Sequence, residues 1–148
     1  MSGACGSEAD AAVLAFDFGM RRIGVAVGNT VTRTARPLAT IAADDRARRL
    51  AAIASLVDEW HPARLVVGLP VHADGTPHAM TARVRAFAWE LGERFALPVA
   101  FEDERHTSEV ARDTLRTAGR GSRRDRPLRD QVAAQIILQA WFDQRHDR

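Results

Sequence analysis

Residues 14–28 form an apolar segment that carries one carboxylate, Asp17, and this combination constrains the fold more than any other feature of the chain. Its pattern predicts a hairpin of two strands, residues 13–18 and 23–27, joined by a tight turn that contains glycine. A strand this apolar is expected to be buried, where an ionised carboxylate is unfavourable unless something compensates its charge. Two explanations fit: an ion pair with an arginine of the turn, or a cation held at the mouth of a site.

The rest of the chain alternates predicted strands and helices. Apolar spacing, caps and prolines place strands at residues 37–41, 64–69 and 98–102, and helices at residues 44–60, 80–95 and 107–117 and from Asp130 onward. We expect Asp44 to cap the first helix, Thr107 or Ser108 to cap the third, and the last helix to bury Val132, Ile136, Ile137, Ala140 and Trp141. The sequence therefore predicts an α/β fold: a mixed five-stranded sheet, three antiparallel strands and then two parallel ones, flanked by helices.

Length and composition indicate one domain. The chain has 148 residues, of which 46% are hydrophobic, and its single cysteine rules out a disulfide framework. We expect the domain to span residues 13–143, between a disordered N-terminal tail, residues 1–12, and a C-terminal tail, residues 144–148. No apolar run has the length of a membrane span, so a soluble, cytoplasmic protein without a membrane partner is expected.

All 21 basic residues are arginine, which excludes a P-loop lysine, a Schiff-base lysine and a lysine general base. Guanidinium groups bind phosphates bidentately, so nucleic acid is a ready partner. Seven arginines and two aspartates lie between residues 112 and 129, in a segment with two glycines. The segment is either a solvated face or a loop that contacts phosphates, through Arg120, Arg123, Arg124 and Arg126.

Acidic residues recur at predicted element ends. Asp17 lies on the first strand, Asp103 and Glu104 follow the fifth, and Asp130 opens the last helix. If the first, fourth and fifth strands are neighbours, these carboxylates converge at one edge, where Mg²⁺ would relieve their repulsion and could activate water for phosphodiester hydrolysis. Each acid also has a structural explanation, such as a favourable position at a helix N-terminus for Asp130 or an ion pair with Arg105 for Asp103.

Four stretches resemble successive motifs of one family: DFGMRRIGVAVG, LVVGLPVHADGTPHAMTARVRAFAWEL, LPVAFEDERHTSEVAR and RDQVAAQIILQAWFD. The family is YqgF, also called RuvX-like, and the resemblance runs in order from Val13 to Asp143. It implies a ribonuclease H-like fold and a nuclease that depends on Mg²⁺ or Mn²⁺. The implied role is processing of the 5′ end of pre-16S rRNA, a structured RNA, in ribosome biogenesis. The alternatives are cleavage of branched DNA at Holliday junctions and a non-catalytic RNA-binding assembly factor. Both a monomer and a dimer are compatible with the sequence.

Position by position, the resemblance implies that the metal ligands are Asp17, Glu104 and Asp130. Asp103 is an alternative ligand or a group that supports the ligands. Arginines expected to contact phosphates or orient the acids are Arg21, Arg22 and Arg105. Gly19 and Gly24 would let the backbone approach the substrate closely.

The sequence also departs from the family pattern. Arg21 replaces a common lysine, His106 replaces an apolar residue, and Gly28-Asn29 stands where Ser-Asp is frequent. The arginine keeps the charge but changes the geometry of a phosphate contact. An actin-like or sugar-kinase ATPase is the competing enzyme class, but its two related domains would need a longer chain.

Overall fold

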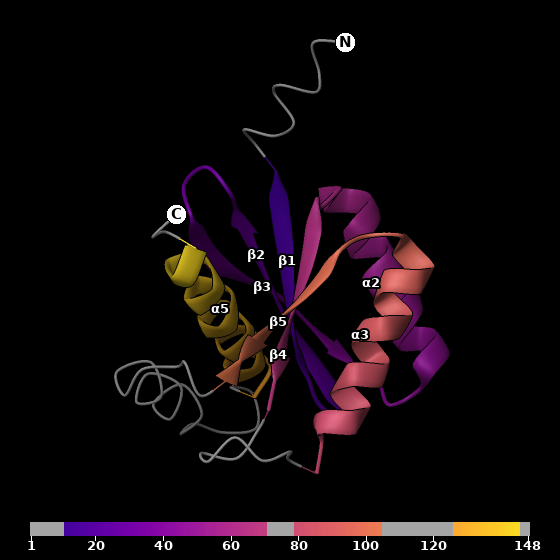
Figure 1. Cartoon of the computed structure of the whole chain (residues 1–148). Helices are drawn as coiled ribbons and strands as arrows, with labels where there is room; N and C mark the ends of the chain where they lie inside the picture. The colour runs from indigo at the N-terminus through magenta and orange to yellow at the C-terminus, as the bar shows by residue number, and fades with distance from the viewer. Residues whose placement is uncertain (1–10, 71–78, 105–125, 146–148) are drawn as a thin grey trace.

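The computed structural model describes residues 11–70, 79–104 and 126–145, which form a five-stranded sheet with helices on both faces (Figure 1). Its strands are β1 (Ala12–Phe18), β2 (Arg22–Asn29), β3 (Thr34–Ala42), β4 (Arg64–Leu69) and β5 (Val99–Asp103). The helices are α2 (Arg46–Trp60), α3 (Thr81–Phe95) and α5 (Arg126–Arg145). The predicted α/β class and its five strands are confirmed.

The strand order is β3-β2-β1-β4-β5, so β1 lies at the centre of the sheet. β1 pairs antiparallel with β2, and β2 pairs antiparallel with β3. β1 pairs parallel with β4, and β4 pairs parallel with β5. The first, fourth and fifth strands are therefore neighbours, the condition under which the acids converge, and β5 lies at the edge of the sheet. Because these three strands are parallel, the carboxyl ends of β1, β4 and β5 lie at the same end of the sheet.

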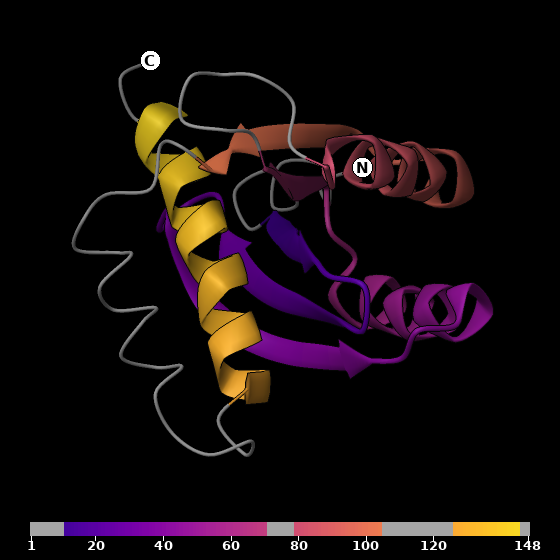
Figure 2. The same ribbon diagram turned by 90° about the horizontal axis from the view of Figure 1, so that it is seen from below.

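The helices form one layer on each side of the sheet. α5 covers one face, and α2 and α3 lie side by side over the other (Figures 1 and 2). In β1, Val13 and Ala15 pack in the cluster that includes α5, whereas Leu14 and Phe16 pack in the cluster that includes α2 and α3. Because side chains alternate along a strand, Asp17 belongs to the α5 face and the next residue to the opposite face.

The last helix differs from the prediction in its start and in its buried side. α5 begins at Arg126, because a proline is tolerated in a first turn, so Asp130 lies in the second turn and does not open the helix. Its buried residues are Ala134, Ile137, Leu138, Trp141 and Phe142. Ile137 and Trp141 are as predicted, but Val132, Ile136 and Ala140 are only half-buried. Apolar residues of this helix occur on several of its sides, so their spacing alone is compatible with more than one buried side.

Other boundaries shift by a few residues. Asp45, not the predicted Asp44, caps α2, because its carboxylate accepts a hydrogen bond from the backbone N–H of Arg48. α5 extends to Arg145, so the first two residues of the predicted C-terminal tail are helical. The predicted third helix, the arginine-rich segment, His106 and most of the N-terminal tail lie outside the described residues. In the part of the chain that is described, no helix has the length and apolar character needed to cross a membrane.

Gly24 allows α5 to lie directly on the sheet. It pairs with Asp17 across β1 and β2. A Cβ atom at this position would stand 1.9 Å from the backbone carbonyl oxygen of Asp130. Only a hydrogen atom fits between the strand and the helix here, and this contact carries Asp130 to the neighbourhood of Asp17.

Replacing Gly24 by alanine should therefore destabilise the protein by about 3 kcal/mol or more, because a backbone carbonyl cannot rotate away from the added methyl group. Gly92 in α3 is the matched control, since the nearest atom to its added Cβ would be 3.5 Å away. Gly92→Ala should stabilise the helix by about 0.5–1 kcal/mol. Urea unfolding measures both changes. A Gly24→Ala variant as stable as the wild type would contradict this packing of α5 on β2.

Candidate active site

Asp17 and Asp130 meet on the α5 face of the sheet, near the carboxyl end of β1. Asp17 projects to this face from β1, and Gly24 lies beside it in β2. The backbone of Asp130 lies on Gly24. The two acids are 113 positions apart in the sequence, yet the charge of Asp130 contributes to the raised pKa of Asp17.

Glu104 joins them from the other side of β1. It directly follows β5, and its Oε2 would be 3.1 Å from a Cβ atom at Gly68. Gly68 belongs to β4, the strand between β5 and β1, and faces α5, because the same Cβ would stand 2.5 Å from Cδ1 of Ile137. Glu104 therefore reaches over β4 towards β1, in space that the missing side chain of Gly68 leaves open.

Asp103 and Glu104 differ in the face that they reach. Glu102 of β5 accepts a 2.5 Å hydrogen bond from Gln144 of α5, so its side chain faces α5. Phe101 instead lies beneath the guanidinium of Arg85, a residue of α3. Strand alternation therefore assigns Asp103 to the α3 face. Of the two neighbouring acids, the structure brings Glu104 to the face of Asp17.

The charge of the carboxylates is poorly compensated. Burial raises the pKa of Asp17 from 3.8 to about 7, and the negative charges of Glu104 and Asp130 contribute to this rise, against an opposing contribution from Arg129. Burial also raises the pKa of Glu104, with an additional contribution from Asp103. No described residue donates a hydrogen bond to the Asp17 carboxylate. Negative charge is therefore concentrated here without the donors that usually stabilise it.

Arg22 forms an ion pair with Asp130, with Nε 2.5 Å from Oδ2. This arginine opens β2 on the α5 face and is mostly buried, as is its partner. The ion pair predicted as one explanation for Asp17 is therefore formed by Asp130, and Arg21 of the same turn is exposed.

The remaining predicted arginines are not placed by the structure. Arg105, Arg120, Arg123 and Arg124, and the side chain of Arg126, lie outside the described residues. Sequence reasoning missed Arg129, whose charge acts on Asp17. Its position next to Asp130 was the available signal.

The donor set suits a hard divalent cation, which prefers carboxylate oxygens. Asp17 and Glu104 could hold such an ion, whereas the Asp130 carboxylate is engaged by Arg22. Within the described ranges, no three acidic, histidine or cysteine side chains are close enough to enclose a metal ion. A site formed by all three acids would therefore require the Asp130 carboxylate to move away from Arg22.

Sequence comparisons give a consistent family. The model of the family described as "RuvX: Holliday junction resolvase" matches residues 11–144. A Dechloromonas aromatica protein named "Putative pre-16S rRNA nuclease" is 57% identical over 134 residues, which cover 90% of this chain and 92% of that protein. A Nitrosomonas europaea protein of the same name is 50% identical over 140 residues, which cover 95% of each chain.

Solved structures agree on the fold. Thermus thermophilus RuvC, in complex with a Holliday junction substrate, matches with a TM-score of 0.61 at 16% sequence identity, over 93% of this chain and 96% of that one. A second T. thermophilus RuvC structure matches with a TM-score of 0.55 at 15% identity, over 92% of this chain and 96% of that chain. At this identity the similarity concerns the fold alone, and it confirms the predicted ribonuclease H-like class.

The pKa of Asp17 predicts a pH-dependent stability in metal-free buffer. Between about pH 4 and pH 7, the native state keeps a proton that the unfolded state has released, so the free energy of unfolding should fall as pH rises. Above pH 7, ionised Asp17 lowers the free energy of unfolding by up to about 4 kcal/mol. Asp17→Asn removes this penalty, so the variant should be more stable than the wild type at pH 8, and the difference should shrink towards pH 4.

Chemical denaturation in EDTA at pH 4, 6 and 8 measures this difference. Glu104 is present in both proteins, so its own titration largely cancels in the comparison. A stability difference that does not change with pH would show that Asp17 has an ordinary pKa.

Proposed function

The chain belongs to the RuvX family, and from this membership we propose that it is a nuclease that hydrolyses phosphodiester bonds in pre-16S rRNA. The observation that carries the proposal is the convergence of Asp17, Glu104 and Asp130 from β1, the end of β5 and α5. Among the described residues, none donates a hydrogen bond to the Asp17 carboxylate, so its negative charge is not compensated in this way. Such a site is suited to chemistry on an anionic backbone only when a cation accompanies the substrate.

We assign Asp17, Glu104 and Asp130 as the residues that would hold Mg²⁺ or Mn²⁺. The chemistry of the donors and the raised pKa of Asp17 support this assignment. When bound, the metal would activate a water molecule and neutralise charge on the leaving oxygen. Asp103 lies towards the other face and is not required as a ligand.

The arginines would position the acids and the substrate. Arg22 holds the carboxylate of Asp130 through their ion pair, and this contact would open when Asp130 binds the metal. Arg21 is exposed at the β1–β2 turn, where it is accessible to a backbone phosphate. Contact with phosphates of the RNA backbone is also proposed for Arg105, Arg120, Arg123, Arg124 and Arg126. The protein would thus bind RNA mainly through charge, with an affinity that falls steeply with salt.

A Holliday junction is the second candidate substrate. The description of the family favours it, and so does the Holliday junction substrate bound in the matching RuvC complex. A four-way DNA junction therefore belongs beside labelled pre-16S rRNA in the same cleavage assay, so that the preferred substrate is decided directly.

The two neighbouring acids, Asp103 and Glu104, provide a sharp test of the site. With Mg²⁺ or Mn²⁺, Glu104→Gln and Asp17→Asn should each reduce cleavage of pre-16S rRNA by about 100-fold or more, since loss of even a supporting contact of a metal ligand costs about 10–100-fold. Asp103→Asn, the matched control, should stay close to wild-type activity. The measurement is the initial rate of cleavage at saturating metal.

For this comparison to report on catalysis, the RNA affinity of each variant must remain near the wild-type value, and each variant must be fully folded at the assay temperature. If Asp103→Asn is inactive and Glu104→Gln is active, the assignment of the ligands is wrong. If the wild type and Asp17→Asn behave identically on both substrates, the protein is a non-catalytic RNA-binding factor.

A further inference from the structure

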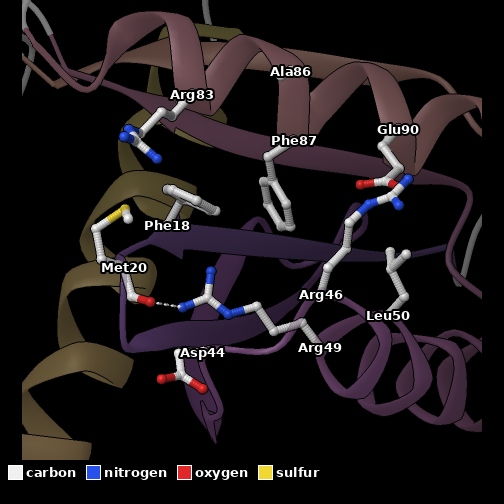
Figure 3. Close-up of a pocket in the computed structure, with 10 residues that line it drawn as sticks. All are labelled: Phe18, Met20, Asp44, Arg46, Arg49, Leu50, Arg83, Ala86, Phe87 and Glu90. Atoms are coloured by element: carbon white, nitrogen blue, oxygen red, sulfur yellow. Dashed lines mark hydrogen bonds and ion pairs between the residues drawn. The ribbon is translucent and has the colours of Figure 1, made fainter.

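A cavity of about 370 Å³ lies on the opposite face of the sheet from the three acids, between α2, α3 and the end of β1 (Figure 3). Phe18 and Met20 line it, and these residues follow closely after Asp17 in the chain. Because Asp17 and Phe18 are successive residues of a strand, their side chains lie on opposite faces only one residue apart. The cavity and the acid site therefore share the carboxyl end of β1, the edge where ligands bind in sheets of this kind.

Arg49 of α2 is buried in the wall of this cavity, with only 8% of its surface exposed. Its Nε donates to the carbonyl oxygen of Ala43, and its Nη2 donates to that of Met20, both at 2.5 Å. The guanidinium lies over the ring of Phe18, with Cζ 5.3 Å from the ring centroid, and no described residue accepts a hydrogen bond from Nη1 (Figure 3). Burial lowers the pKa of this guanidinium, and no carboxylate forms a described ion pair with it. A buried cation with unused donors is suited to an anionic ligand.

Arg83 adds a second positive charge at the same end. It lies in the first turn of α3, and its side chain extends towards Phe18 and Met20 in Figure 3. It forms no ion pair with any described acid. The third arginine of the cavity, Arg46, is already paired with Glu90 at the far end. Asp44 is exposed, and its negative charge favours the charged form of Arg49. Because one aspartate stands against Arg49 and Arg83, the open end of the cavity has a net positive charge.

The remaining walls are apolar. The rings of Phe18 and Phe87 lie with their centroids 4.9 Å apart, and Leu50 lines the cavity beside them. Met20 is 49% exposed at the open end. An inorganic anion would leave these apolar walls unfilled, whereas a nucleotide presents a phosphate to the arginines and a sugar and base to the walls. The cavity volume is at the lower end of the range for small-molecule sites, as a single nucleotide requires.

We propose that this cavity is a nucleotide subsite, in which Arg49 and Arg83 bind a phosphate and Met20, Leu50 and Phe87 contact the attached sugar and base. The proposal rests on the proposed nuclease function, because the nucleotide is a unit of the substrate strand. The strand crosses the end of β1, with its scissile phosphate at Asp17 and a neighbouring nucleotide in the cavity. A free nucleoside monophosphate presents the same chemistry and should enter the same site.

Met20 provides a direct probe, since it is one of only three methionines in the chain. In protein labelled with ¹³C-methyl methionine, 5′-AMP and a six-nucleotide single-stranded RNA should each shift the Met20 methyl resonance, which Met20→Leu identifies. Arg83→Gln should raise the concentration needed for half of the shift by about tenfold, because it removes a charged hydrogen bond to phosphate. Arg85→Gln is the matched control: it removes the same charge from the same helix, but Arg85 lies over Phe101, outside the cavity.

The experiment separates this proposal from the nuclease assignment. Asp17→Asn should keep the Met20 shift, because Asp17 lies on the other face. A shift with RNA and AMP from a protein that cleaves nothing would sink the nuclease function and leave nucleotide binding in place. Active protein whose Met20 resonance responds to neither probe would overturn the subsite, and so would a shift with AMP alone or an equal effect of Arg83→Gln and Arg85→Gln. A response to inorganic phosphate as strong as that to AMP would contradict the role of the apolar walls.

Discussion

The contact between the backbone of Asp130 and Gly24 determines where the proposed active site lies. A helix normally packs on a sheet through side chains, but here a strand glycine lets a backbone carbonyl approach where any Cβ would clash. α5 consequently places Asp130 near Asp17, and Gly68 leaves comparable space for Glu104. Two glycines, one in each of the strands that flank β1, thus allow Asp130 and Glu104 to approach Asp17 from opposite sides. The arrangement raises the pKa of Asp17, which is the electrostatic consequence of this close packing.

Strand alternation then divides the end of β1 between two environments. Asp17 enters the acidic face under α5, whereas Phe18 enters the arginine-lined cavity between α2 and α3. The turn that follows is tied to both sides: Arg49 donates to the carbonyl of Met20, and Arg22 pairs with Asp130. Two partly buried guanidinium contacts therefore hold this turn, and a ligand in either environment would lie close to the same few residues.

The sequence predicted the α/β class and the five strands well because both depend on local pattern and chain order. The apolar run around Asp17 and the buried strand at residues 64–69 have little freedom in an α/β sheet. The start of α5 was missed because proline at its first turn looks like a loop residue, and its buried side was missed because apolar residues surround the helix. The partner of Arg22 and the buried position of Arg49 depend on tertiary contacts between residues 108 and 29 positions apart, which no local pattern encodes.

Asp17 is hard to explain by stability alone. Its charge is disfavoured by burial and by two neighbouring acids, and no described residue donates a hydrogen bond to its carboxylate. An uncharged residue of the same shape would fit the strand with less electrostatic cost, as the surrounding apolar residues show. Arg22 does not relieve the charge of Asp17 directly, because it pairs with Asp130. This cost to stability supports the proposal that a ligand compensates the charge of Asp17, and a bound divalent cation would meet that requirement.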